Sequence, residues 1–135
     1  MKILQPPGWA QPRGYSNGIA AEGTIVFVAG QIGWDAEQRF RSEEFAGQTA
    51  QALRNTLAVL AEAGAGPEHV AKMTWYVTSR REYLESVREI GTTWRELMGR
   101  HYPAMAVVQV SALIEPLAKI EIETTAVLPR RAARE

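Results

Sequence analysis

Apolar and polar positions alternate in several parts of the chain, and this alternation is typical of β-strands with one buried face. It predicts strands at Tyr15–Ala21, Thr24–Ala29, Val70–Thr78, Ala104–Leu113 and Ala118–Val127. A Glu22-Gly23 turn joins the first two segments and an Ile114-Glu115-Pro116 turn joins the last two, so both pairs are expected to form hairpins. Gly30 and Gly33 follow the second strand and indicate a bulge or a close backbone approach there.

Two other segments place apolar residues every three or four positions, which is the spacing of one helix face. The first predicted helix runs from about Glu43 to Ala63, with Ser42 as its cap and Gly64 at its end. The second begins at Ser79, which has capping-box spacing to Glu82. Its apolar face consists of Tyr83, Val87, Ile90, Trp94 and Leu97. The order ββαβαββ predicts an α+β fold in which two helices cover one face of a mixed sheet.

The second face of this sheet has a mixed character. In the last strand, Ile120, Ile122 and Ala126 alternate with polar residues, so one side is apolar and the other polar. The polar side is expected to carry Glu121 and, from the neighbouring strand, Met105, Val107, Gln109 and Ser111. This face is too apolar to be fully solvated and too polar to form the hydrophobic core of one protomer, which is typical of a subunit interface. A closed cyclic oligomer would cover it.

The composition indicates one domain and excludes several classes of function. The 135 residues, of which 46% are hydrophobic, suffice for a single core, with an extended arm at 1–14 and a charged tail at 129–135. Fifteen basic residues balance fifteen acidic ones, which argues against nucleic acid and membrane surfaces as partners. The sequence contains no cysteine, no signal-peptide core and no apolar run of transmembrane length. We therefore expect a soluble, cytoplasmic protein.

Common catalytic and metal motifs are missing from the sequence. His69 and His101 are the only histidines and have no HxxxH spacing, so no metal site is expected. Asp35 is the only aspartate and there is no GxSxG elbow, which leaves a serine triad without its parts. The segment GWAQPRG lacks the GK[ST] of a phosphate loop.

Six strings of residues resemble one known family. They are Gly14-Tyr15-Ser16, VFVAGQI at 26–32, QALRNTLAVLAEAG at 51–64, VAKMTWYVT at 70–78, Pro103-Ala104 and KIEIETTAV at 119–127. In this order they resemble the Rid family, also called YjgF/YER057c/UK114, with the older label endoribonuclease L-PSP. The resemblance implies a chorismate-mutase-like protomer and a homotrimer with three ligand clefts between subunits. It also implies hydrolysis of reactive imines and enamines to a 2-oxo acid and ammonia, with no cofactor.

The resemblance also assigns candidate site residues by position. The glutamate thought to orient water or move a proton falls on Glu121, the cleft tyrosine on Tyr15 and the glycine of the GQI turn on Gly30. The arginine that holds the substrate carboxylate is replaced by Met105, and an asparagine of the second helix is replaced by Arg88. Methionine cannot form the bidentate, charge-assisted hydrogen bonds that arginine offers a carboxylate. We therefore expect weak activity on 2-aminoacrylate, the small substrate of the family, and partial recovery in Met105→Arg.

Each of these residues has a plainer interpretation. Met105 either packs at an interface or forms the floor of a pocket for a less polar ligand, and Glu121 is either a solvated strand residue or a proton carrier. Arg88 is either a surface charge or a relocated cation that replaces the missing arginine. Trp34 either walls the cleft or anchors its loop. Two functions stay open: an imine or enamine deaminase, with 2-aminomuconate among the conjugated substrates considered, and a catalytically inactive small-molecule-binding or interaction trimer.

Overall fold

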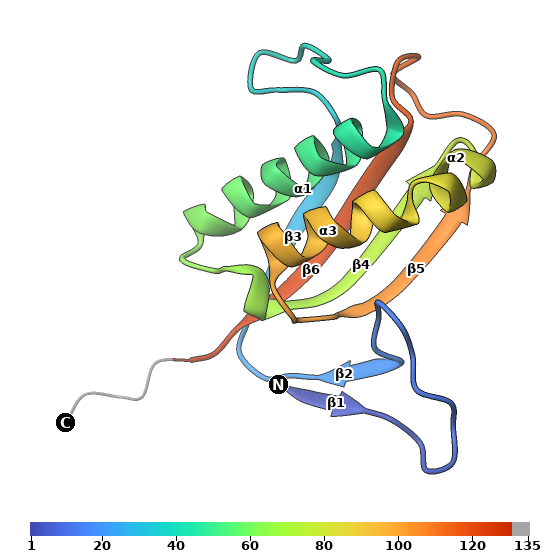
Figure 1. Ribbon diagram of the computed structural model, residues 1–135. Helices are drawn as coiled ribbons and strands as arrows, with labels where there is room; N and C mark the ends of the chain where they lie inside the picture. The colour runs from blue at the N-terminus through green and yellow to red at the C-terminus, as the bar shows by residue number, and fades with distance from the viewer. Residues whose placement is uncertain (131–135) are drawn as a thin grey trace.

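Four strands form a mixed sheet in the order β3-β6-β4-β5, and two more form a separate two-stranded sheet, β1-β2, beside it (Figure 1). The computed structural model describes residues 1–130. Along the chain the elements are β1 (Lys2–Leu4), β2 (Gly18–Ala20), β3 (Thr24–Ile32), α1 (Phe45–Glu62), the 3-10 turn η1 (Pro67–His69), β4 (Val70–Val77), α2 (Arg80–Glu85), α3 (Val87–Met98), β5 (Ala104–Gln109) and β6 (Ile120–Leu128). The predicted α+β class is confirmed, and both main helices cover the same face of the sheet.

The predicted N-terminal hairpin is wrong. β2 pairs with β1, in the segment expected to be an unpaired arm, and β3 pairs antiparallel with β6 from Thr24↔Leu128 onward. Gly23 has a φ of 144° and passes so close to the backbone of Leu128 that a Cβ at this position would lie 2.8 Å from its carbonyl carbon. The chain therefore does not fold back at Gly23, because β3 is already bound to the longer strand β6.

The predicted C-terminal hairpin is also wrong, because β4 separates β5 from β6. β5 runs parallel to β4, with Met73↔Met105 and Trp75↔Val107 in register, whereas β6 is antiparallel to β4. Parallel neighbours need a long crossover, and α2 with α3 supplies it. The loop after β5 then carries the chain past β4 to the inner position of β6.

The second predicted helix is interrupted. Ser79 accepts a hydrogen bond from the Glu82 amide over 3.1 Å, so the predicted cap is confirmed. The helix pauses at Ser86, which divides it into α2 and α3. In the first helix, Ser42 accepts from the Glu44 amide and the helix begins at Phe45, two residues later than predicted.

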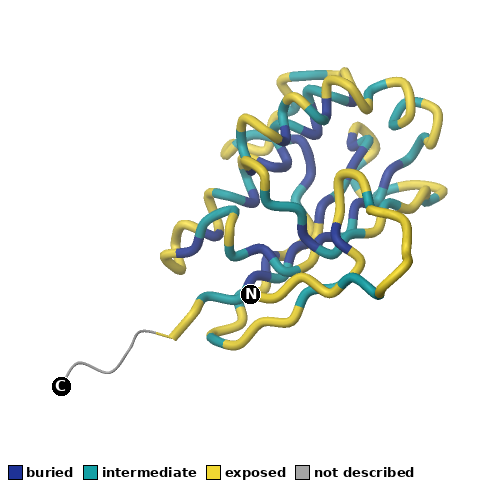
Figure 2. The backbone as a smooth tube through the Cα atoms, turned by 60° about the horizontal axis from the view of Figure 1, so that its bottom comes forward, coloured by how far each residue is buried: buried dark blue, intermediate teal, exposed yellow. Residues whose placement is uncertain are grey.

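The core lies between the sheet and the two helices. Figure 2 shows the buried positions gathered in the interior and the N-terminal segment exposed along most of its length. Leu53 and Leu60 of α1 and Ile120 and Ile122 of β6 are fully buried there. The predicted alternation along β6 is confirmed, since Ile120, Ile122 and Ala126 face the core.

The predicted composition of the second face is wrong for β5. Met105 and Val107 are paired in register with the buried Met73 and Trp75, so they lie on the helix-covered side and pack against the core. Gln109 lies there too, because its side-chain oxygen accepts from the Arg80 amide at the start of α2. The residues on both sides of β5 are apolar, so the sequence pattern does not indicate which side is buried.

The loop before α1 is organised around one carboxylate. Asp35 accepts hydrogen bonds from the amides of Glu37 and Arg39 over 2.9 and 3.0 Å and from the Arg41 Nε over 2.6 Å. These interactions, with the Arg41 side chain contributing most, lower the pKa of Asp35 below its ordinary value of 3.8. The loop is thus held by an ionised group.

The pKa shift of Asp35 predicts how stability changes in acid. Because the folded-state pKa is lowered, the contribution is present above the unfolded-state value of 3.8 and is lost as the pH falls through the folded-state pKa. Asp35→Asn is expected to flatten the acid side of the stability curve, measured by urea unfolding at a series of pH values. Glu43→Gln, at an exposed carboxylate nearby, is the control, and an unchanged acid slope in Asp35→Asn would contradict this interpretation.

Candidate functional site

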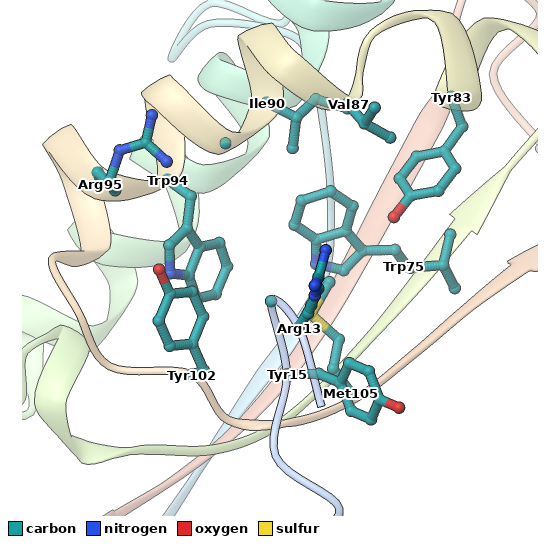
Figure 3. A pocket seen from close by; sticks show the side chains of 13 residues that line it. Arg13, Tyr15, Trp75, Tyr83, Val87, Ile90, Trp94, Arg95, Tyr102 and Met105 are labelled. Atoms are coloured by element: carbon teal, nitrogen blue, oxygen red, sulfur yellow. The ribbon is translucent and has the colours of Figure 1, made fainter. Parts of the chain in front are cut away.

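A cavity of about 520 Å³ opens between α3, β5 and the loop that precedes β2 (Figure 3). Its walls are mostly aromatic and apolar. The lining side chains are Arg13, Tyr15, Trp75, Tyr83, Val87, Ile90, Trp94, Arg95, Tyr102, Met105 and Val107, with Gly14 and Gly91. This volume is within the range of small-molecule sites, about 300–1,000 Å³.

Three aromatic rings form a continuous wall of the cavity. Trp94 stacks on Tyr102 with a centroid distance of 6.1 Å and an interplanar angle of 11°, and it lies 6.2 Å from Trp75. The indole N–H of Trp94 donates to the His101 carbonyl oxygen over 3.1 Å. Trp75 and Trp94 belong to the core, at 1% and 5% exposure, but their rings also line the cavity.

The loop that closes the cavity is held by Ser16. The Ser16 backbone amide donates to the Pro103 carbonyl oxygen over 2.9 Å, and the Ser16 hydroxyl donates to the Tyr102 carbonyl oxygen over 2.5 Å. These bonds fix the loop to the start of β5, next to Met105. Arg13 and Tyr15 are thereby brought to the cavity, and the Arg13 side chain stands in the middle of the view in Figure 3.

The cavity has a cationic and hydrogen-bonding character in spite of its apolar walls. Arg13 and Arg95 are its only charged lining residues, and no carboxylate among residues 1–130 lies within ion-pair distance of either. The Nε1 atom of Trp75 is buried and has no hydrogen-bond partner within the same residues. Burial raises the pKa of Tyr83 above its ordinary value of 10.0, so this phenol stays a donor at neutral pH.

A second group of candidate residues lies on the open face of the sheet. Glu121 pairs in register with Tyr76, and the alternation along β6 turns it away from the core. β3 bulges between Val28 and Gln31, and this bulge brings the backbone of Gly30 against the Glu121 carboxylate. A Cβ at Gly30 would lie 2.7 Å from the Glu121 Cδ, so any larger residue there would displace the carboxylate from its present position.

The sequence-predicted site residues therefore fall into separate places. Tyr15 and Met105 line the cavity, where Met105 belongs to its apolar wall, while Glu121 and Gly30 meet on the opposite face of the same sheet. Arg88 is exposed on α3 and does not line the cavity. The Trp34 ring packs on Phe40 with a centroid distance of 5.9 Å, and the Trp34 carbonyl oxygen accepts from the Asn55 side-chain amide over 2.7 Å. Trp34 therefore anchors its loop.

Sequence reasoning missed Arg13 and Arg95 and the cavity role of the tryptophans. One signal for Arg13 was present. Arg13 stands two residues before the cleft candidate Tyr15 in the sequence. Arg95 had no such signal, because its helical turn carries polar residues on several sides.

Two other classes of feature are absent from residues 1–130. Across residues 1–130, no three His, Asp or Glu side chains come together as a metal site needs. Within the same range, no helix is both long enough and apolar enough to cross a membrane.

Comparison with known proteins gives consistent matches over almost the whole chain. Residues 9–128 match the family model described as endoribonuclease L-PSP. A RutC family protein of Aquifex aeolicus is 33% identical over 94% of this chain and 99% of its own length. The 2-iminobutanoate/2-iminopropanoate deaminase of Salmonella typhimurium is 29% identical over 78% of this chain and 80% of its own. Among solved structures, the Rid family protein YyfB of Yersinia pestis superposes with a TM-score of 0.82, at 29% identity, over 94% of this chain and 98% of its own.

Proposed function

The chain belongs to the Rid family, whose sequence model carries the description endoribonuclease L-PSP, and from this membership we propose that it hydrolyses an imine or enamine to the oxo compound and ammonia. One observation supports the proposal: the cationic cavity and the Glu121–Gly30 contact lie on opposite faces of the sheet, and we interpret each as one half of a site. The cavity half offers a binding pocket with cations, and the Glu121–Gly30 half offers a carboxylate beside bare backbone. Neither half is a complete site for this chemistry.

In the proposed reaction Glu121 handles the proton of water. Glu121 accepts a proton as the water oxygen bonds to the imine carbon, and the imine nitrogen gains a proton. Glu121 then returns its proton to the amine nitrogen as the C–N bond breaks, and the electron pair leaves with the nitrogen as ammonia. The hydroxyl proton passes to the solvent, which had protonated the imine nitrogen in the first step, as C=O forms. The imine and one water thus become the oxo compound and ammonia, and Glu121 returns to its starting state.

The two half-sites meet only if protomers associate, because a sheet separates them within one chain. We propose a homotrimer, in which the cavity of one protomer faces the Glu121 half of its neighbour. The open face supports this assembly, since Ile25, Phe27 and Val108 are exposed there by 57%, 76% and 42% and no helix covers them (Figure 1). Apolar side chains of this size at the edges of an uncovered sheet indicate a partner surface.

The test is turnover of a panel of imines generated in the cuvette by amino-acid oxidases, together with 2-aminomuconate, a longer conjugated enamine. The expected result is faster disappearance of at least one imine and faster release of ammonia than in buffer. Because Met105 replaces the arginine that would bind the substrate carboxylate, 2-aminoacrylate is expected to be a poor substrate. No acceleration with any member of the panel would refute the proposed deaminase activity.

A second candidate function, a non-catalytic small-molecule-binding or interaction trimer, is favoured by Met105 alone. It predicts that ligands bind in the cavity and that no imine is turned over. The Glu121–Gly30 contact favours the deaminase, because a carboxylate beside bare backbone can take a proton from water, which a cavity that merely binds does not require.

A further inference from the structure

We propose that the substrate of this site is a 2-imino acid with an aromatic side chain. Its carboxylate is bound by Arg13, which takes the role of the arginine that the family resemblance places at position 105. The inference rests on the proposed deaminase function and names its substrate class. It follows from the walls of the cavity, from the position of its cations and from an unpaired indole N–H.

The walls favour an aromatic ring over a short chain. Trp75, Met105 and Val107 come from neighbouring strands on the helix-covered side of the sheet, and Trp94 comes from α3 with Tyr102 stacked on it, so a flat group meets aromatic and apolar side chains from both layers. Aromatic pairs and sulfur–aromatic contacts stabilise such an arrangement beyond the area they bury. A cavity of about 520 Å³ would leave a three-carbon imine loosely held.

The charges favour one carboxylate on the ligand. Arg13 lies on the loop that Ser16 fixes against the start of β5, and it lines the same cavity as Met105. Arg95 lies across the cavity on α3, and its guanidinium is 3.5 Å from the Thr92 hydroxyl. With no carboxylate of residues 1–130 paired with either, the cavity attracts an anion.

The Trp75 indole supplies an independent sign that a ligand is missing from the protomer. A buried polar group without a partner is costly, and buried indole N–H groups normally have one, as Trp94 has with His101. Trp75 is 1% exposed and lines the cavity. The Nε1 atom has almost no accessible surface, so the oxygen of a carboxylate or oxo group on a bound ligand becomes its acceptor when the ring turns toward the cavity.

The test uses stable 2-oxo acids, which are the products of the proposed reaction. Phenylpyruvate is expected to bind at least about tenfold more tightly than pyruvate, measured by titration calorimetry. Arg13→Gln is expected to weaken phenylpyruvate about ten- to a hundredfold, as loss of a hydrogen bond between charged groups does. Phenylacetone, which has the ring but no carboxylate, should bind equally to the wild type and to Arg13→Gln.

Control variants separate the role of Arg13 from general charge effects. Arg88→Gln, at the exposed arginine of α3, and Arg54→Gln, at an exposed arginine of α1, should leave phenylpyruvate binding unchanged. Gly91→Phe should obstruct the cavity, because Gly91 lines it and a Cβ there meets only the Arg95 guanidinium, at 3.6 Å. A loss of binding in Arg88→Gln but not in Arg13→Gln would overturn the assignment of the cation.

The outcomes also distinguish this inference from the function on which it rests. Equal binding of pyruvate and phenylpyruvate, or tighter binding of muconate than of phenylpyruvate, would overturn the aromatic substrate class even if imines were hydrolysed. Binding of phenylpyruvate that depends on Arg13, without turnover of the imine made from phenylalanine, would uphold the ligand class and refute the deaminase.

Discussion

Glu121→Gln is expected to lower the turnover number for the best imine substrate by about 10²–10⁴-fold, the usual contribution of a positioned general base. The amide has nearly the same size and cannot take a proton from water. Glu121 lies in a half-buried position beside Gly30, where no side chain can intervene between the carboxylate and the backbone. The folded state and its assembly are expected to survive, so melting temperature and sedimentation should be unchanged.

Glu123→Gln is the matched control, because Glu123 stands two residues further along β6 on the same face and is exposed. It should retain full turnover. Mixing Glu121→Gln protomers with Gly91→Phe protomers adds a test of where the halves meet. If each site takes one half from each of two subunits, one site in every mixed trimer regains both intact halves, which is about a quarter of all sites after random exchange of equal amounts. Activity that stays absent after verified subunit exchange would show that each site is built within one chain.

Local signals in the sequence predicted the elements well, and pairing between strands was predicted poorly. The Ser79 cap and the buried side of β6 depend on a few neighbouring residues, and both are confirmed. The two hairpins depended on turn residues that fit a hairpin, but the partner of a strand is set by the whole sheet. β6 is inserted between β3 and β4, and no local pattern in either hairpin segment reports this.

The candidate site shows the same division. Gly30 and Glu121 were named from a resemblance and lie in contact, whereas Met105 was placed on the wrong face, since both sides of β5 are apolar. Because Met105 faces the cavity, the arginine that the resemblance places at this position would also face the cavity. Met105 is part of an aromatic and apolar cavity whose cations come from Arg13 and Arg95, elsewhere in the chain. The residue at position 105 does not indicate which other element of the chain supplies the cations of the cavity.

The open face of the sheet leads to the second large effect. Phe27 is 76% exposed on β3 in the protomer, so if the chain acted alone Phe27→Asp would change its stability within about ±0.5 kcal/mol. In a trimer the same change puts an unpaired carboxylate into a subunit interface, which costs several kcal/mol. We expect Phe27→Asp to sediment as a folded single chain at micromolar concentration, where the wild type sediments with the mass of three.

Loss of assembly is expected to remove activity together with mass, because Glu121 and the cavity lie on opposite faces of the sheet and only a neighbour can unite them. Val59→Asp is the matched control: Val59 is 40% exposed on α1, on the helix side of the protomer. This variant should keep both the assembly and the turnover of the wild type. A wild-type protein that sediments as one chain and still hydrolyses imines would contradict the shared site, and Glu121 would then have to act without the cavity of a neighbour.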